Sequence, residues 1–249
     1  AEQGGTVVVF DDVTVLNQAQ RDAAWAEVAR RLAHEVKNPL TPIRLAAERL
    51  RMKLMGKLET DDGQMLDRST GTIVSQVEAL RSLVDAFSDY AQDPELERAP
   101  LELDSLIRDV VALYQHHDQR VEFELDLVEG PPGLSADGGQ VRQLLHNLIA
   151  NSSEAVSGTE KAKVRISTRV VKRAGSTWLD LELSDQGPGY PREVLEKPFE
   201  PYVTFKTTGS GLGLAICRKI VSDHDGRISI SNPESGGACT RVSLPLGED

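Results

Sequence analysis

The sequence feature that most constrains the fold is a pair of apolar seams on two consecutive stretches of helical pattern. The first stretch runs from about Leu16 to Leu58, and the second ends near Ala91. Along both, apolar residues recur in steps of three and four, the spacing of helices that pack lengthwise on one another. The first seam comprises Leu32, Val36, Leu40, Ile43, Ala47, Leu50 and Leu54, and the second Leu66, Ile73, Val77, Leu80, Val84, Phe87 and Ala91.

A short turn, predicted at Glu59–Gly63, joins the two stretches, which therefore form a helical hairpin. A hairpin alone is too thin to enclose a hydrophobic core, whereas two hairpins together make a four-helix bundle. We therefore expect a homodimer. The alternative is that the hairpin packs against the C-terminal half of its own chain.

The composition excludes several classes of protein. The 249 residues carry a formal net charge of −11, which disfavours nucleic acid as the main partner because phosphate binding needs a basic surface. No apolar run approaches the ~20 residues that span a bilayer. The two cysteines, Cys217 and Cys239, are too few for a disulfide framework and favour a reducing compartment. Residues 6–15 have the pattern of a strand, and without an initiator Met the chain is expected to be part of a longer protein.

The pattern changes after the hairpin, where Asp93-Pro94 and Ala99-Pro100 interrupt the chain. Periodicity then predicts three helices and five strands, which make an α+β domain with helices on one face of a sheet. The predicted helices are 104–116, 138–157 and 211–224, and the predicted strands are 121–127, 164–173, 178–185, 227–231 and 240–244.

A histidine on the first helix is the first candidate for chemistry. His34 lies two residues from both Leu32 and Val36, so it is expected to point away from the seam into solvent. Neutral imidazole is a nucleophile near pH 7, and the adjacent Glu35 carboxylate could take up its proton. Asn38 is one turn further on the same face and could position a water. The alternatives are a solvated surface histidine and a metal ligand, although no second His or Cys lies one turn away.

Two asparagines on the predicted helix 138–157 are the second candidate. Asn147 and Asn151 are four residues apart and therefore share one face of the helix. Their amide oxygens could join a magnesium shell that phosphates and water complete. The alternative is a pair of solvated asparagines.

A carboxylate and two glycines at the end of a strand are the third candidate site. Asp185 ends the predicted strand 178–185 and is followed by Gly187 and Gly189. The carboxylate could accept a hydrogen bond from the exocyclic amine of adenine, and the glycines would let the backbone approach a flat ring. Taken alone, this pattern is also that of a plain turn.

A glycine-rich loop before the last helix is the fourth candidate site. Gly209, Gly211 and Gly213 precede or open the helix, with Leu212 between them, so that backbone N–H groups can face an anion. The loop is neither the dinucleotide fingerprint nor a Walker-type loop. Upstream, residues 198–202 are either an apolar anchor or the hinge of a lid from which Lys206 reaches a phosphate.

Together these segments resemble the two-component sensor histidine kinases. Five segments follow the family's order: the H-box at 34–40, the N-box at 147–155, the G1 box at 185–189, the F-box at 198–202 and the G2 box at 209–214. The local sequences around His34 and Phe199 most resemble those of the nitrogen-regulation subgroup of NtrY or NtrB type. Departures from the family pattern are Gln186, Ser152, Phe205 and the segment Ala238-Cys239-Thr240.

The resemblance implies a fold and a division into domains. Residues 1–15 would be the closing strand of a PAS-like sensor domain, and 16–95 a signalling helix with the dimerisation and phosphotransfer hairpin. Residues 96–249 would form a Bergerat-type (GHKL) α+β sandwich that binds ATP. The implied fold is therefore a helical hairpin in a dimeric four-helix bundle, followed by this ATP-binding domain.

The resemblance also implies roles on the hairpin. His34 would be the phosphoacceptor, Glu35 the general base, and Asn38 the residue that orients water for dephosphorylation of the partner. The partner would be the receiver domain of a response regulator. The chain would be the cytoplasmic portion of a membrane-anchored bacterial sensor, with no membrane contact of its own and no nucleic acid bound.

In the ATP-binding domain, the resemblance assigns the cofactor residues for ATP and Mg2+. Asn151 would be the chief magnesium ligand with Asn147 assisting, and Asp185 would hold adenine. Lys206 and the loop Gly209–Gly213 would surround the phosphates.

Other readings stay open from the sequence. One is a clamp ATPase of gyrase, chaperone or mismatch-repair type, a class that lacks the segment around His34. Another is a scaffold that binds a partner without chemistry. Within the family, the sequence does not rank kinase against phosphatase activity, because it holds both His34-Glu35 and Asn38.

Overall fold

The computed structural model describes residues 14–91, 96–117, 121–130, 133–157, 162–173, 175–201, 203–204 and 211–247. The chain divides into two compact units, 1–93 and 94–249. Most of the strand predicted at 6–15 lies outside the described residues. Its last two residues, Thr14 and Val15, are the first of a helix, so the prediction is wrong there.

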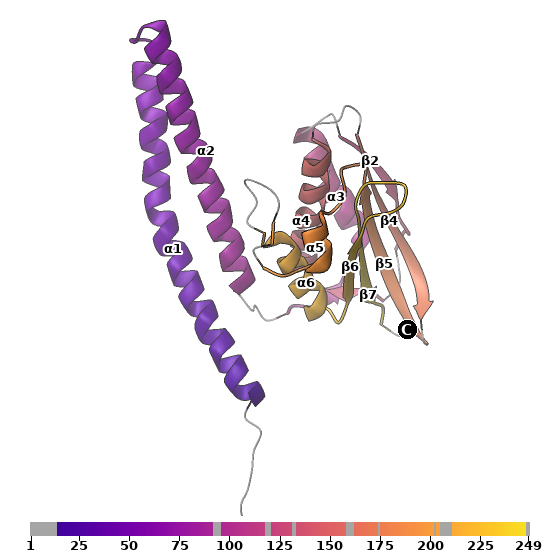
Figure 1. Cartoon of the computed structure of the whole chain (residues 1–249). Helices are drawn as coiled ribbons and strands as arrows, with labels where there is room; N and C mark the ends of the chain where they lie inside the picture. The colour runs from indigo at the N-terminus through magenta and orange to yellow at the C-terminus, as the bar shows by residue number, and fades with distance from the viewer. Residues whose placement is uncertain are drawn as a thin grey trace, which may run out of the picture. The chain divides into compact units, whose positions relative to one another are not determined.

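The first unit is a hairpin of two long helices, α1 (Thr14–Leu54) and α2 (Thr60–Ala91) (Figure 1). The turn predicted at Glu59–Gly63 is wrong, because α2 already begins at Thr60. The N–H of Gly63 donates to the carbonyl of Glu59 at 2.8 Å, which closes the first helical turn. Two acidic residues, Asp61 and Asp62, stabilise that end of the helix through its dipole.

The hairpin buries only part of the predicted seams. Leu40 and Ala47 of the predicted seam on α1 are almost fully buried in the single chain, and so is Ala33, which the predicted seam did not include. Other seam positions on α1 remain largely exposed: Leu32 at 46%, Val36 at 36%, Ile43 at 45% and Leu50 at 51%. One chain alone therefore leaves a long apolar stripe in contact with water, which is unusual for a folded surface.

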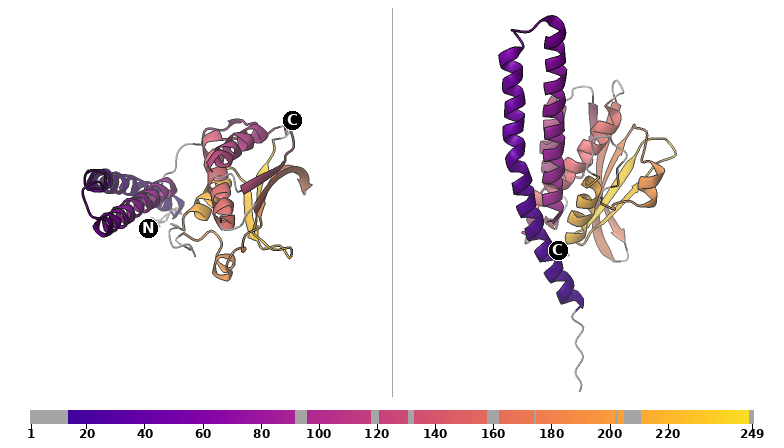
Figure 2. Two further views of the ribbon diagram at one scale, coloured as in Figure 1. Left: turned by 90° about the horizontal axis from the view of Figure 1, so that it is seen from above. Right: turned by 60° about the vertical axis from the view of Figure 1, so that its left-hand side comes forward.

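The second unit is a mixed sheet with three helices on one face (Figure 2). Its strand order is β2-β4-β5-β7-β6, with β2 and β4 parallel and every other pair antiparallel. The strands are β2 (Val121–Asp126), β4 (Ala162–Arg173), β5 (Ser176–Asp185), β6 (Arg227–Ser231) and β7 (Cys239–Pro245). The helices on the sheet are α3 (Leu103–His117), α4 (Gly138–Val156) and α6 (Gly213–Asp223).

Alternation along the strands explains this layering. On β5, Leu179, Leu181 and Leu183 are buried under the helices, whereas the residues between them face outward. The helices supply the other half of the core, with Leu144, Leu145 and Ile149 of α4 fully buried. The predicted helices and strands of this unit are thus confirmed within a few residues, as is the α+β fold.

Three short elements were not predicted from the sequence. The two-stranded ladder of β1 (Ala99–Pro100) and β3 (Ser135–Ala136) joins the start of the unit to the loop before α4. The single-turn helix α5 (Arg192–Glu196) follows β5. All three are too short to show a hydrophobic period.

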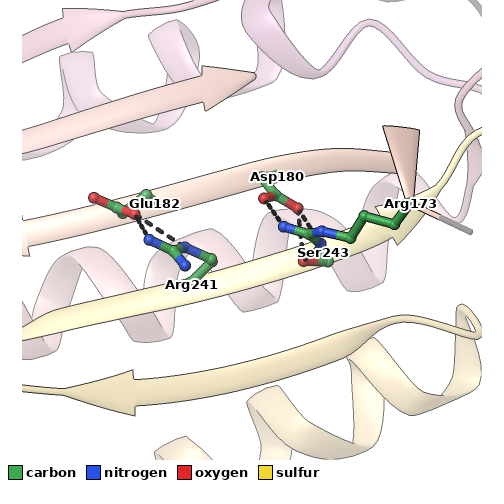
Figure 3. Close-up of polar contacts among 5 residues, drawn as sticks. All are labelled: Arg173, Asp180, Glu182, Arg241 and Ser243. Carbon is green, nitrogen blue, oxygen red and sulfur yellow. Dashed lines mark hydrogen bonds and ion pairs between the residues drawn. The ribbon is translucent and has the colours of Figure 1, made fainter. Parts of the chain in front are cut away.

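The outer face of the sheet carries paired charges (Figure 3). Arg241 of β7 donates to the Glu182 carboxylate of β5 at 2.7 Å, and Arg173 of β4 donates to Asp180 at 3.0 Å. Ser243 donates to the same Asp180 carboxylate at 2.7 Å. Acidic β5 thus lies between basic partners on both sides, an arrangement that favours this strand order. The Arg241–Glu182 pair is the more exposed of the two and contributes little energy.

A buried histidine joins the end of α6 to the start of α4. His224 is 3% exposed, and its Nε2 accepts the backbone N–H of Asp137 at 2.9 Å. Its Nδ1 therefore carries the proton and donates to the carbonyl of Ile220 at 2.8 Å. Asp137 in turn caps α4 by accepting from the N–H groups of Gly139 and Gln140.

We expect His224→Ala to destabilise the second unit by about 2 kcal/mol, because the backbone N–H of Asp137 loses its acceptor, the carbonyl of Ile220 loses one of its two donors and the buried ring leaves a cavity. Urea unfolding of the full chain, followed by circular dichroism, measures this change. Ser229→Ala, at an exposed position of β6, is the control and should leave the midpoint unchanged. An unchanged midpoint for His224→Ala would contradict the structural role assigned to the imidazole.

Candidate functional site

Asp185 ends β5 on the face of the sheet that the helices cover. It is 8% exposed, and its Oδ1 accepts the N–H groups of Gly187 at 2.9 Å and Ala238 at 3.2 Å. Its own N–H donates to the carbonyl of Ala238 at 3.0 Å. These contacts hold the carboxylate rigidly and leave Oδ2 without a hydrogen bond from the described residues.

Glycines make this arrangement possible. A Cβ at Gly187 would lie 3.0 Å from the Cβ of Ala155 on α4 and 3.0 Å from Asp185 Oδ1. A Cβ at Gly237, whose φ is +80°, would lie 1.8 Å from the carbonyl oxygen of Asp185. Gly187 was predicted from the sequence, whereas Gly237 was missed, although the pair Gly236-Gly237 is a turn signal.

The predicted asparagines lie on α4 beside α6. A Cβ at Gly213, the first residue of α6, would lie 3.8 Å from the Asn151 side-chain nitrogen. The Asn147 Nδ2 is buried and has no hydrogen-bond acceptor among the described residues. Its neighbour is the fully buried Cys217, a thiol whose pKa burial raises to about 12 against the opposing effect of the Asn147 amide.

α6 begins two residues after a glycine and has no capping side chain at its N-cap position. Its N-cap residue Leu212 supplies no side-chain hydrogen bond, and Gly211 before it has a φ of +68°. Backbone N–H groups at the first turn of a helix, together with the helix dipole, suit an anion. Lys206 and Gly209, which the sequence places in the same loop, lie outside the described residues.

The structure therefore brings most predicted residues of the second unit together. Gly187 contacts α4, Asn151 of α4 adjoins Gly213 of α6, and Asp185 lies at the start of the same turn. Within the described residues, no cluster of three or more His, Cys, Asp or Glu could hold a metal ion. The amide oxygens of Asn147 and Asn151 are hard donors suited to Mg2+, and a cation there would also need phosphate oxygens.

His146, next to Asn147, gives the second unit a pH dependence. The Tyr114 hydroxyl donates to the His146 carbonyl at 3.2 Å and lies 3.4 Å from its Nδ1. Burial, and secondly the charge of Arg142, lower the pKa of His146. Near and below about pH 6.5 the unfolded chain therefore binds more protons than the folded one, and the second unit becomes less stable as the pH is lowered.

We expect the urea concentration at the unfolding midpoint of the second unit to decrease when the pH is lowered from about 7.5 to about 5.5. The decrease should be smaller in His146→Leu. The variant keeps the backbone carbonyl that Tyr114 contacts but removes the titrating ring. Parallel pH profiles for the two proteins would contradict the assignment.

The predicted residues of the hairpin occupy one exposed stretch of α1. His34 is exposed, as is Asn38 one turn later. The Glu35 carboxylate accepts from Arg31 Nε at 3.0 Å, and the two side chains are 59% and 82% exposed. The stretch is anchored from α2, because Lys37 forms an ion pair with Asp85.

Two family models match the chain, one for each unit. Residues 24–95 match the His Kinase A (phospho-acceptor) domain. Residues 136–248 match the histidine kinase-, DNA gyrase B-, and HSP90-like ATPase. The second match alone would also suit a clamp ATPase. The presence of both matches in one chain favours a histidine kinase over a clamp ATPase.

A full-length match supports the combination. The sensory histidine kinase/phosphatase NtrB of Rhizobium leguminosarum bv. phaseoli is 30% identical over the whole of this chain and 67% of its own length. The chain belongs to the sensor histidine kinase family. The nitrogen regulation protein NtrY of Azorhizobium caulinodans is 40% identical over 96% of this histidine kinase. The chain spans about a third of the length of the NtrY-type relatives it matches, 31% in that case and 37% for NtrY-like kinases of Rickettsia.

Solved structures of histidine kinases share the fold. Full-length ShkA in complex with AMPPNP matches 90% of this histidine kinase with a TM-score of 0.68 and 25% identity, and 46% of ShkA is covered. ThkA in complex with the response regulator TrrA matches 95% with a TM-score of 0.63 and 27% identity, and 68% of ThkA is covered. None of the helices in the described residues is both long and apolar enough to cross a membrane.

Proposed function

We propose that this histidine kinase phosphorylates itself on His34 from Mg-ATP and passes the phosphoryl group to an aspartate of a response regulator. The observation that carries the proposal is the pairing of two sites in one chain. An exposed histidine with adjacent Glu35 lies on the hairpin. In the second unit the turn after Asp185 contacts α4 at Ala155, and Asn151 of α4 lies beside Gly213 at the start of α6.

In the second unit, Asp185 Oδ2 would accept a hydrogen bond from the exocyclic amine of adenine. Asn151, assisted by Asn147, would hold Mg2+, which offsets the negative charge of the phosphates when it is bound. The N-terminus of α6, with Gly211 and Leu212, would face the phosphates, and Lys206 would reach them from the preceding loop.

On the hairpin, one ring nitrogen of neutral His34 would attack the γ-phosphorus in line. The new N–P bond would form as the bond from γ-phosphorus to the bridging oxygen of ADP breaks. Glu35 would accept a hydrogen bond from the other ring nitrogen and stabilise the positive charge that develops. Its ion pair with Arg31 is largely exposed, so exchanging partners costs little.

The same stretch supports a second activity. Asn38 would orient a water for hydrolysis of the phosphorylated aspartate on the receiver domain. The relative NtrB is named a kinase/phosphatase, and the structure of ThkA with TrrA contains a response regulator. The first name supports a phosphatase activity beside the kinase activity, and the second supports a response regulator as the partner of this chain.

The proposal includes a homodimer and a division of the chain. A second hairpin would cover the exposed stripe that contains Leu32, Val36, Ile43 and Leu50. Residues 16–95 would then be the signalling helix and phosphotransfer hairpin, and 96–249 the catalytic domain. Residues 1–15 would be the end of a PAS-like domain within a membrane-anchored sensor, with this portion in the cytoplasm.

The experiment that tests the proposal follows the γ-phosphate of radiolabelled Mg-ATP. We expect label to remain on the chain, in up to one equivalent per protomer, with little free inorganic phosphate. A chain that released all the label as phosphate and retained none would be an ATPase of the wider fold instead. Added receiver domains of the same source should then remove the label from the chain.

A further inference from the structure

Tyr190, in the loop that follows Asp185, is held both at its backbone and at its hydroxyl. It directly follows Gly189, and its hydroxyl lies 2.6 Å from Thr240 Oγ1 on β7. Its backbone is clamped by the side chain of Asn232, whose Oδ1 accepts the Tyr190 N–H at 2.7 Å. The Asn232 Nδ2 donates to the Tyr190 carbonyl at 2.8 Å. The ring therefore has little freedom to move.

Through its hydroxyl, Tyr190 reaches Thr240 on the helix-covered face of the sheet. Thr240 is 4% exposed and is the cross-strand partner of Leu183. Asp185 is two residues further along β5, a diagonal neighbour at about 7–8 Å. Burial raises the pKa of Tyr190 to about 12, and the Asp185 carboxylate acts in the same direction, as expected for a phenol next to it.

The contact between Asn232 and the Tyr190 backbone also requires a glycine at position 189. Gly189 has a φ of +83°, and a Cβ there would lie 2.9 Å from the Asn232 side chain. A glycine, an asparagine and a buried threonine thus fix Tyr190 between the loop after β5 and strand β7. A purine that hydrogen-bonds to Asp185 Oδ2 would place its exocyclic amine next to this ring.

We infer that Tyr190, held by Asn232 and Thr240, forms the wall of the base site and limits the substituent that the exocyclic amine of a bound purine can carry. This inference rests on the proposed function, since it takes Asp185 as the residue that binds adenine. Tyr190 acts here as a specificity residue, because it excludes larger bases without taking part in phosphoryl transfer.

The test compares ATP with benzyl-ATP, an analogue that carries a benzyl group on the exocyclic amine. We expect the wild-type chain to use ATP and to reject benzyl-ATP. In Tyr190→Ala, kcat/KM for benzyl-ATP should rise at least about tenfold, while KM for ATP rises and kcat for ATP changes less than about threefold. Tyr190→Phe keeps the ring and should still reject benzyl-ATP.

Tyr114→Ala is the matched control, because it removes another half-buried tyrosine of the same unit and should give no gain with benzyl-ATP. Tyr190→Leu, a milder truncation, replaces Tyr190→Ala if that variant does not fold. Folded variants that use ATP but reject benzyl-ATP as strictly as the wild type would overturn the inference alone. If Asp185→Asn binds ATP as well as the wild type, the nucleotide site itself, and the inference with it, is overturned.

Discussion

Replacing Asn151 with alanine is expected to lower the rate of autophosphorylation by about 100-fold or more. The side chain lies on α4 beside the first residue of α6, where Mg2+ and the phosphates of ATP are proposed to meet. Its loss would remove a protein ligand from the cation that orients and neutralises the transferring group. The rate of label incorporation from γ-labelled Mg-ATP measures the effect.

The neighbouring positions on α4 provide the controls for Asn151→Ala. Asn147→Ala, which removes the assisting ligand, should cost about tenfold. Arg142→Ala, at an exposed position of the same helix, should leave the rate unchanged. Binding of ATP in the absence of Mg2+ should be the same in Asn151→Ala as in the wild type. A full rate in Asn151→Ala at saturating Mg-ATP would show that the asparagine is not a ligand.

Replacing Asp185 with asparagine is expected to weaken ATP binding by about 100-fold or more. The Oδ1 contacts to Gly187 and Ala238 can be kept by the amide oxygen, so the fold has no reason to change. The amide nitrogen then takes the place of Oδ2 and presents a donor to the amine of adenine, which is also a donor. Calorimetric titration of the chain with ATP measures the loss.

A change of preference separates this effect from damage to the site. Asp185→Asn should gain relative affinity for GTP, because the 6-oxygen of guanine accepts a hydrogen bond from the new amide. Asp180→Asn is the matched control: it makes the same substitution on the same strand, but on the outer face, next to Arg173 (Figure 3). Equal weakening by the two variants would contradict the role of Asp185.

Periodicity predicted the elements that repeat and missed those that do not. The seams of α1 and α2 and the alternation along β5 extend over many residues, so one or two atypical positions do not obscure them. The start of α2 was placed too late, because Asp61, Asp62 and Gly63 have the composition of a turn. In the structure the two acidic residues stabilise the first turn of the helix instead.

The seam on α1 also shows what a single sequence leaves undecided. Spacing groups Leu32 with Leu40, yet one hairpin buries Leu40 at 6% exposure and leaves Leu32 at 46%. We propose that both positions are apolar because α1 packs on two neighbours, α2 of its own chain and the hairpin of a second chain. The apolar pattern predicts that these side chains are buried against other helices. Which helix buries each side chain depends on how the helices pack, and the pattern does not give that.

The candidate site was predictable where the chemistry needs several residues close in sequence. Asp185, Gly187 and Gly189 fall within one turn, and Asn147 and Asn151 share one helix face. The supports of Asp185 come from far along the chain, because Ala238 and Gly237 lie in the loop before β7. Such contacts leave no local pattern, because they depend on the order of strands in the sheet.

The measurement that tests the account most directly is the chemical identity and position of the phosphoryl group after incubation with Mg-ATP. The account predicts a label that is stable to base and labile to acid, as a phosphoramidate is, and that is absent from His34→Ala although this variant binds ATP normally. A label that survives acid, or one that persists in His34→Ala, would contradict the assignment of His34 as the phosphoacceptor.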